Sequence, residues 1–351
     1  MTQSRSTVFV LGAGFTRAFY PNAPLMRDDW GVDELIKKFG SIPGLRRILE
    51  HEKSFKPPNI DIERLMTRLD EQMPYDLSEV GLSEAIASLL QELKYQLIQR
   101  IQQAGDTNAT DLPSDLEKIA GYCVTQKINC VTFNYDDFFD RALWKASCAT
   151  HAGTAWRPDM GYGFFCRPST SLFDASSVFP RQTKILLLKL HGSVNWFIKF
   201  GSQAPYLLDS VVHHADWYAD WKHNAALDKN KMLEHLEKLP FIVPPILAKR
   251  GTLNQPILRK VWEEAYRTLR GAESVVFLGY RFPSTDIAAS FLFGEALQGK
   301  LENIRVVVKP CPGLEETLKK AYRAALPDLS DKQFFFEDAR DWLLQNYVGG
   351  S

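Results

Sequence analysis

Four short segments of the chain carry glycines or side chains of the kinds found at binding and catalytic sites. They lie at residues 12–17, 132–137, 189–193 and 278–286, and each follows or ends an apolar run. Asn134, Asp136 and His191 supply an amide, a carboxylate and an imidazole, which are groups that bind polar ligands and move protons. These three side chains are the candidates for chemistry.

The first segment, Gly12 to Arg17, reads G-A-G-F-T-R and follows the apolar run Val8 to Leu11. Small residues at such a turn let the backbone approach a ligand, and the helix that follows offers N–H groups to a phosphate. A dinucleotide fingerprint has the form G-x-G-x-x-G, but Arg17 occupies the third glycine position, which weakens the case for a hydride-transfer enzyme. The segment is either a nucleotide-binding turn or a tight turn without a ligand.

The second segment, T-F-N-Y-D-D, lies where a strand should end. Ligands of open α/β sheets bind at the carboxyl ends of the strands, and Asn134 and Asp136 are spaced to face one cleft there. The alternative is structural, with Asn134 ending the strand and Asp136 or Asp137 capping the next helix. Taken alone, this segment favours the cap.

His191 ends the third apolar run and is followed by Gly192 and Ser193. An imidazole, with its ordinary pKa of about 6.5, suits proton abstraction at neutral pH. A lone histidine is more often structural, although a strand end is where a base is useful. The fourth segment, L-G-Y-R-F-P-S-T-D from Leu278, is another strand-to-helix junction with glycine at the turn.

The apolar runs predict the elements that position these residues. The runs are continuous rather than alternating, as in strands buried on both faces of a parallel sheet. Helical patterns separate them, for example at 116–123 and 257–269. This alternation predicts an α/β fold with a doubly wound, Rossmann-like, mostly parallel sheet. The runs lie at residues 8–11, 130–133, 185–190, 275–278 and 304–308.

Two stretches interrupt the alternation. Residues 30–105 contain helical patterns and no convincing strand, which predicts a helical insertion after the first strand. Residues 201–239 are polar and aromatic and predict a second insertion within the main domain. The main domain would therefore comprise residues 1–29 and 106–351.

Composition narrows the functional classes. The chain has 351 residues with 42 Lys+Arg and 42 Asp+Glu, so direct nucleic-acid binding, which usually needs a basic surplus, is not indicated. Five cysteines without a C-x-x-C pair, and histidines 213, 214 and 223 without spaced carboxylates, predict neither a disulfide framework nor a metal site. The sequence shows no secretory signal and no apolar run long enough for a membrane span, so we expect a cytoplasmic protein.

Taken in order, the motifs G-A-G-F-T, T-F-N-Y-D, L-H-G-S and L-G-Y-R-F-P-S-T-D resemble the sirtuin-like family. The resemblance is closer to its bacterial NAD-hydrolysing, antiphage branch than to the protein deacylases. Deacylases carry a zinc ribbon of paired C-x-x-C motifs and a glutamine before the catalytic asparagine, whereas this chain has no such pair and has Phe133 at that position. The bacterial branch lacks the zinc module and has a large helical insertion after the first strand.

The resemblance implies an NAD+ glycohydrolase that releases nicotinamide and ADP-ribose, with NAD+ as substrate and no zinc. It implies that Asn134 holds the nicotinamide ribose or a water, that His191 is the general base, and that Asp136 shapes the nicotinamide pocket. Arg17 either pairs with a phosphate or the ribose or merely lies in a helix, and Arg27 is a rival for the ligand-binding role. The residues implied to contact NAD+ are Gly12, Ala13, Gly14, Phe15, Thr16, Arg17, Phe133, Gly192, Ser193, Gly279, Tyr280 and Lys309.

The same resemblance implies a homo-oligomer and a separate sensor or activator protein, since the chain has no spare domain for sensing. Two other functions stay open. One is a regulatory subunit that binds NAD or ADP-ribose without turnover, and the other is a protein deacylase or ADP-ribosyltransferase. Asn134 and His191 speak against the first, and the missing zinc module speaks against the second.

Overall fold

The computed structural model describes most of the chain. Arg27, Ser284, Thr285 and the second expected insertion, apart from residues 211–213, lie outside the described residues. The described ranges are 6–25, 28–55, 61–71, 73, 75, 79–105, 112–151, 154–168, 183–198, 211–213, 240–243, 255–283 and 286–349.

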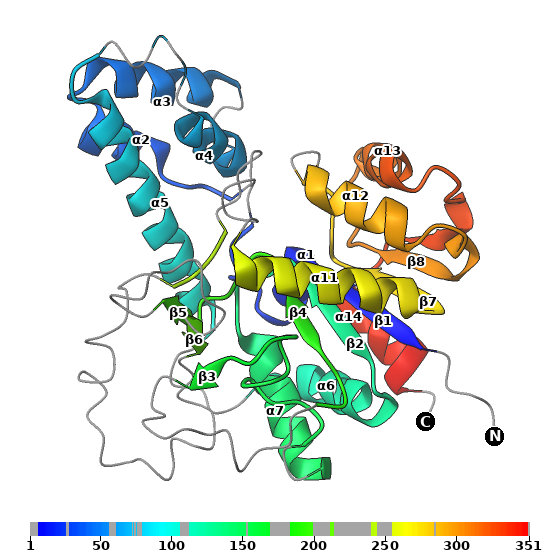
Figure 1. Cartoon of the computed structure of the whole chain (residues 1–351). Helices are drawn as coiled ribbons and strands as arrows, with labels where there is room; N and C mark the ends of the chain where they lie inside the picture. Colours follow the sequence, from blue (N-terminus) through cyan, green and yellow to red (C-terminus); the bar gives the residue numbers. More distant parts are fainter. Residues whose placement is uncertain are drawn as a thin grey trace, which may run out of the picture.

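Six parallel strands form the central sheet in the order β4-β2-β1-β7-β8-β9 (Figure 1). Numbered along the chain, this is the 3-2-1-4-5-6 order of a Rossmann fold, so the predicted fold class is confirmed. The strand order reverses between β1 and β7, and ligands of such sheets bind at this switch point, beyond the carboxyl ends of the strands. The strands are β1 (Thr7–Leu11), β2 (Asn129–Thr132), β4 (Leu187–Lys189), β7 (Ser274–Leu278), β8 (Ile304–Val307) and β9 (Phe334–Phe335).

Helices cover both faces of the sheet, which explains why β1 reads as a continuous apolar run and is buried from Val8 to Leu11. One layer contains α1 (Ala13–Phe19), α6 (Ser114–Gln126), α7 (Phe138–His151) and α14 (Ala339–Leu343). The other contains α11 (Pro256–Gly271), α12 (Ile287–Ala296) and α13 (Glu315–Ala325) (Figure 1). Short turns complete the main part: η2 (Leu301–Asn303), η3 (Asp331–Gln333) and the π-helical η4 (Leu344–Val348).

The expected helical insertion is present and stands at one end of the molecule, blue to cyan in Figure 1. It contains α2 (Val32–Phe39), α3 (Pro43–Phe55), α4 (Ile62–Asp70) and α5 (Leu82–Ala104). Their apolar faces form a second hydrophobic cluster, which also includes Tyr135, Val194 and Ile242 from the main part of the chain. The insertion therefore packs on the loops that follow β2 and β4.

A small second sheet was not expected from the sequence. It has the order β3-β6-β5 and is built from β3 (Arg167–Pro168), β5 (Trp196–Ile198) and β6 (Val211–His213). Strands of two or three residues are too short to show a hydrophobic period, which also explains why β9 was missed. None of the described helices combines the length and the apolar character needed to cross a bilayer.

Candidate active site

The glycine turns after β1 and β7 pack directly against each other at the switch point. The N–H of Gly12 donates to Leu278 O, and the N–H of Gly14 donates to Gly279 O, both at 3.0 Å. A Cβ on Gly12 would lie 2.4 Å from Tyr280 Cα. A side chain at this turn would therefore force the two strand ends apart.

Gly279 has a second reason to be glycine. Its φ is +64°, in the left-handed region, and a Cβ there would lie 2.2 Å from the backbone nitrogen of Phe15. The N–H of Phe15 donates to Gly12 O, so the N–H groups of Gly12, Gly14 and Phe15 all bond within the protein. The sequence predicted that N–H groups at this turn would bind a phosphate. These three N–H groups are not available for that, because each already has an acceptor in the protein.

Asn134 follows β2 and is tied to the glycine turn by its side-chain amide. Its Nδ2 donates to Gly12 O and to Thr16 Oγ1, both at 2.9 Å. Thr16 Oγ1 donates in turn to Asp136 Oδ2 at 2.7 Å. Since the amide has only two hydrogens and both are used, Asn134 Oδ1 is the atom of this side chain that remains for a ligand.

The Asp136 carboxylate contacts both the start of α7 and the helix after β1. Its Oδ1 accepts from the N–H of Phe138 at the start of α7, at 3.3 Å, while its Oδ2 accepts from Thr16. Burial of the carboxylate raises the pKa of Asp136 to about 6, against the opposing effects of Lys189 and of the Thr16 hydrogen bond. This carboxyl therefore keeps its proton to a higher pH than an ordinary aspartate does.

A fully buried ion pair lies beneath this turn. Lys189 on β4 donates to Asp140 Oδ2 at 3.2 Å and to the backbone oxygen of Asp136 at 2.5 Å. The hydroxyl of Tyr162 also donates to Asp140, at 2.5 Å. Burial raises the pKa of Asp140, and Lys189 opposes the rise. The pair fixes the loop after β2 against β4.

Neighbouring strands bring Asn134 and His191 to the same edge of the sheet. Thr132 on β2 pairs with Lys189 on β4, and the N–H of Leu190 donates to Thr132 O. Asn134 and His191 each lie two residues beyond that pair. The register of the two parallel strands therefore places both residues just beyond the carboxyl ends of neighbouring strands.

The His191 imidazole lies in an aromatic and acidic pocket. Its ring centroid is 5.1 Å from that of Phe133 and 6.1 Å from that of Tyr135, the residues on either side of Asn134. His191 Nε2 lies 3.5 Å from Asp286 Oδ1, and Asp286 Oδ2 accepts from the hydroxyl of Tyr280 at 3.1 Å. Burial and the charge of Asp286 raise the pKa of Tyr280, so this hydroxyl stays protonated.

A continuous series of contacts links Asn134 to His191 around the switch point. Asn134 bonds to Gly12, whose turn packs against Tyr280, and Tyr280 bonds to Asp286, which faces His191. The rings of the two residues that flank Asn134 lie beside the imidazole, with centroids 5.1 Å and 6.1 Å from its own. An amide and an imidazole on adjacent strand ends are thus held by one continuous set of contacts.

The structure gives several of the other predicted residues a different placement. Phe15 is buried against Phe19 and Phe139, and Ser193 is buried and donates to Tyr135 O at 3.3 Å. Two other residues were implied to contact NAD+. Ala13 is exposed at the turn after β1, and Gly192 follows His191 with a φ of +77°.

Tyr280 and Phe133 stack on each other, with ring centroids 4.4 Å apart, beside His191. Tyr280 is buried there, although the resemblance implied that it contacts NAD+. Arg17 donates to Ala23 O and to Asp28, which ties α1 to the following loop. Lys309 lies beyond β8, with its amine exposed and 4.0 Å from Asp338.

Asp286 is the residue that sequence reasoning missed. It stands last in the quoted L-G-Y-R-F-P-S-T-D segment and directly precedes α12, where an aspartate is expected to cap. In the structure its side chain makes no capping hydrogen bond and faces His191 and Tyr280 instead. The sequence alone does not distinguish a helix cap from a partner of His191, because the contact joins residues nearly a hundred positions apart.

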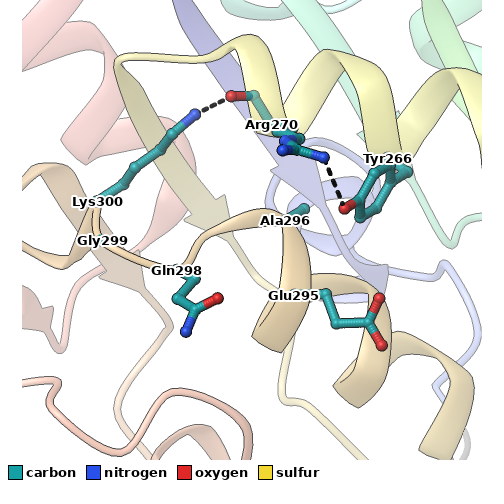
Figure 2. A pocket seen from close by; sticks show the side chains of 7 residues that line it. All are labelled: Tyr266, Arg270, Glu295, Ala296, Gln298, Gly299 and Lys300. Atoms are coloured by element: carbon teal, nitrogen blue, oxygen red, sulfur yellow. Dashed lines mark hydrogen bonds between the residues drawn. The ribbon is translucent and has the colours of Figure 1, made fainter.

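A surface pocket of about 600 Å³ lies away from this site (Figure 2). Lys300 lies across its edge and donates to the carbonyls of Leu269, Arg270 and Ala272, which end α11. Cations stabilise helix C-termini in this way, so the cluster has a structural explanation. The lining residues are Tyr266, Arg270, Glu295, Ala296, Gln298, Gly299 and Lys300. Over the described ranges, no group of three or more His, Cys, Asp or Glu side chains is arranged to hold a metal ion.

No family model matches the chain, and neither does any curated protein sequence. Solved structures that resemble it include Sir2 (sirtuin) proteins. One, from a study of the mechanism and regulation of Sir2 enzymes, is 11% identical over 98% of this chain and 92% of that chain, with a TM-score of 0.40. A Sir2 homologue in complex with NAD is 12% identical over 93% and 91%, also with a TM-score of 0.40. A structure from work on sirtuin substrate affinity is 13% identical over 99% and 95%, with a TM-score of 0.43. Similarities this low say nothing about the activity or the site residues of this chain.

Proposed function

We propose that this chain is an NAD+ glycohydrolase that cleaves NAD+ to nicotinamide and ADP-ribose. One observation carries the proposal: Asn134 and His191, from adjacent strand ends, lie in a continuous series of contacts at the switch point of a Rossmann-like sheet. Nucleotides bind at that position in such sheets. A site that only bound a nucleotide would need neither a base nor a side chain to hold a water.

In the proposed reaction the bond between C1′ of the ribose and N1 of nicotinamide breaks, and its electron pair goes to the ring nitrogen. Nicotinamide leaves as a neutral molecule, so no general acid is needed. A water oxygen bonds to C1′ and gives its proton to His191. The protein's tasks are to stabilise a ribose that resembles an oxocarbenium ion and to place the water.

The contacts of Asn134 fit its assigned part. Because both amide hydrogens are bonded to Gly12 and Thr16, the Oδ1 atom is the one that accepts from a ribose hydroxyl or from the attacking water. Asp136 supports this orientation, since an ionised carboxylate can only accept and so makes Thr16 donate toward it. Asp136 thereby acts on the site through Thr16.

The test is to incubate the purified full chain with NAD+ and to follow nicotinamide and ADP-ribose by chromatography. We expect equal amounts of both products. Asn134→Ala and His191→Ala should each lower kcat by about 10²- to 10⁴-fold, the range of general base catalysis, with unchanged circular dichroism. His51→Ala is the matched control because its side chain is 57% exposed on the helical insertion. A parental rate in either site variant contradicts the assignment.

We further propose that the activity serves antiphage defence and is switched on by a partner protein or by assembly of the chain. The test is to express the chain in bacteria, infect them with phage and measure cellular NAD+. Loss of NAD+ after infection with the parental chain, but not with Asn134→Ala, supports this role. If calorimetry detects NAD+ binding but no condition yields nicotinamide, the chain is a binding subunit and the proposed hydrolysis is wrong.

A further inference from the structure

The carboxylate of Asp286 is built into the site but has no part in the function proposed above. It is 2% exposed, and its two oxygens face two different groups: Oδ1 lies 3.5 Å from His191 Nε2 and Oδ2 accepts from Tyr280. The His191 side chain is 6% exposed. A carboxylate and an imidazole are thus paired out of bulk water.

We propose that Asp286 is a positioning residue for His191: it holds the imidazole in place and stabilises the imidazolium that forms when His191 takes a proton. The assignment rests on the proposed function, in which His191 is the general base. The proton passes from the attacking water to His191, and Asp286 stays ionised throughout. This division of labour is that of the acid–histidine pair in hydrolytic triads.

The anchoring of Asp286 supports a positioning role. Tyr280 donates to its Oδ2, and the Tyr280 ring is itself fixed by stacking on Phe133, with 16° between the ring planes. The hydroxyl of Tyr322 donates to Tyr280 O at 2.7 Å. Three aromatic side chains therefore fix the carboxylate, which in turn faces the base.

The Nε2–Oδ1 separation is within ion-pair range but longer than a good hydrogen bond. Catalytic hydrogen bonds are often long in the absence of substrate and shorten in the complex. When His191 becomes charged, attraction to Asp286 increases, because a cation and an anion in a buried site are weakly screened. The pair is therefore arranged to strengthen in the step in which the proton moves.

Among the described residues, other ionisable groups near His191 come from three further elements. Tyr135 follows β2 and Tyr280 follows β7, and burial raises the pKa of both, so both hydroxyls are neutral. Glu63 on α4 adds negative charge, since it raises the pKa of the same two tyrosines. Lys189, two residues before His191 on β4, is paired with Asp140. Within the part of the chain that the structure describes, the Asp286 carboxylate lies 3.5 Å from the imidazole.

The test uses the full chain and reads His191 by NMR, independently of turnover. The His191 signal is assigned by its absence from His191→Gln, and its titration is followed in the parental chain and in Asp286→Asn. We expect the midpoint to move to lower pH by about one to three units, because an adjacent negative charge favours the imidazolium by about that much. Asp331→Asn, an exposed carboxylate paired with Arg323, is the control and should leave the midpoint unchanged.

An unchanged midpoint in Asp286→Asn overturns the proposal, whether or not the chain hydrolyses NAD+. A shifted midpoint without any nicotinamide release leaves the pair established and contradicts the proposed function instead. Asp286→Ser removes the same charge with another good helix-capping residue, and it replaces the asparagine variant if that variant does not fold.

Kinetics separate positioning from a general structural effect. Asp286→Asn should lower kcat by about tenfold to a thousandfold with little change in KM, since it acts through a base that contributes at most about 10⁴-fold. The double variant His191→Ala/Asp286→Asn should be no slower than His191→Ala alone. A further loss in the double variant means that Asp286 acts on something other than His191, which contradicts the proposal.

Discussion

Thr16 Oγ1 donates to Asp136 Oδ2 at 2.7 Å, although the two residues are 120 positions apart in the chain. The same hydroxyl oxygen accepts from Asn134. The Thr16 hydroxyl therefore links the helix after β1 to the loop after β2 by hydrogen bonds, and it orients the Asn134 amide.

Thr16→Val should test this hydrogen-bonded link, because valine keeps the shape of threonine and removes the hydroxyl. One amide hydrogen of Asn134 and one oxygen of Asp136 would lose their partner, which typically costs about 1–3 kcal/mol for buried groups. We expect a correspondingly lower free energy of unfolding in urea and a fall in kcat of about tenfold or more. Thr125→Val is the control, since Thr125 is exposed and its hydroxyl donates to the carbonyl of Gly121 in its own helix. Equal losses of unfolding free energy and of kcat in the two variants would contradict a linking role for the Thr16 hydroxyl.

Asp136 should make stability depend on pH in a predictable direction. Its pKa is about 6 in the folded chain and about 3.8 for an ordinary aspartate, so the folded state holds more protons between these values. The stabilising contribution is fully present below the lower value and is lost as the pH rises through the higher one. The unfolding free energy of the parental chain, minus that of Asp136→Asn, should therefore fall between about pH 4 and pH 7. A difference that rises with pH contradicts this assignment.

Lys189→Met should be strongly destabilising. It leaves Asp140 charged and buried without its cation, and removing one partner of a buried pair costs about 3–5 kcal/mol. Thermal unfolding measures the loss. The double variant Lys189→Met/Asp140→Asn should regain part of it, since asparagine is uncharged and still accepts from Tyr162. A double variant less stable than Lys189→Met would show that the charge of Asp140 is not the cause.

A comparison of Gly279→Ala with Gly299→Ala should separate two costs of adding a Cβ: the cost of the left-handed backbone and the cost of steric overlap. Both glycines have positive φ, but a Cβ on Gly299 meets nothing within 4 Å, whereas one on Gly279 would overlap Phe15 N. Gly299→Ala should cost about 1 kcal/mol for the left-handed backbone alone. Gly279→Ala should cost several kcal/mol in chemical denaturation and should impair the site. Similar costs would mean that the two turns separate without strain.

The central strands could be predicted because burial on both faces leaves a continuous apolar signal. That signal located β1, β2, β7 and β8 within a residue or two, and the strand ends then pointed to Asn134 and His191. β4 is shorter than the apolar run 185–190, because only three of those residues pair with β2. β9, with two residues, has no detectable pattern.

The details of the site could not be predicted, because they depend on contacts between distant segments. Asp286 has the position of a helix cap in the sequence, and only the fold brings it to His191. Tyr280 was expected at a ligand, but the approach of the two glycine turns directs its ring onto Phe133. The placement of Lys189 against the Asp136 carbonyl depends on the register of β2 and β4. The division of the chain into domains, the roles of the site residues and the partners stay predictions.

Asn134 and Tyr135 are consecutive, yet their side chains contact different parts of the structure. Asn134 is bonded to the turn after β1, while the Tyr135 side chain is embedded among the insertion helices, and its hydroxyl donates to Val243 O at 2.8 Å. One peptide unit therefore joins the turn after β1 to the hydrophobic cluster of the insertion, so any displacement of those helices would reach the torsion angles beside the Asn134 amide.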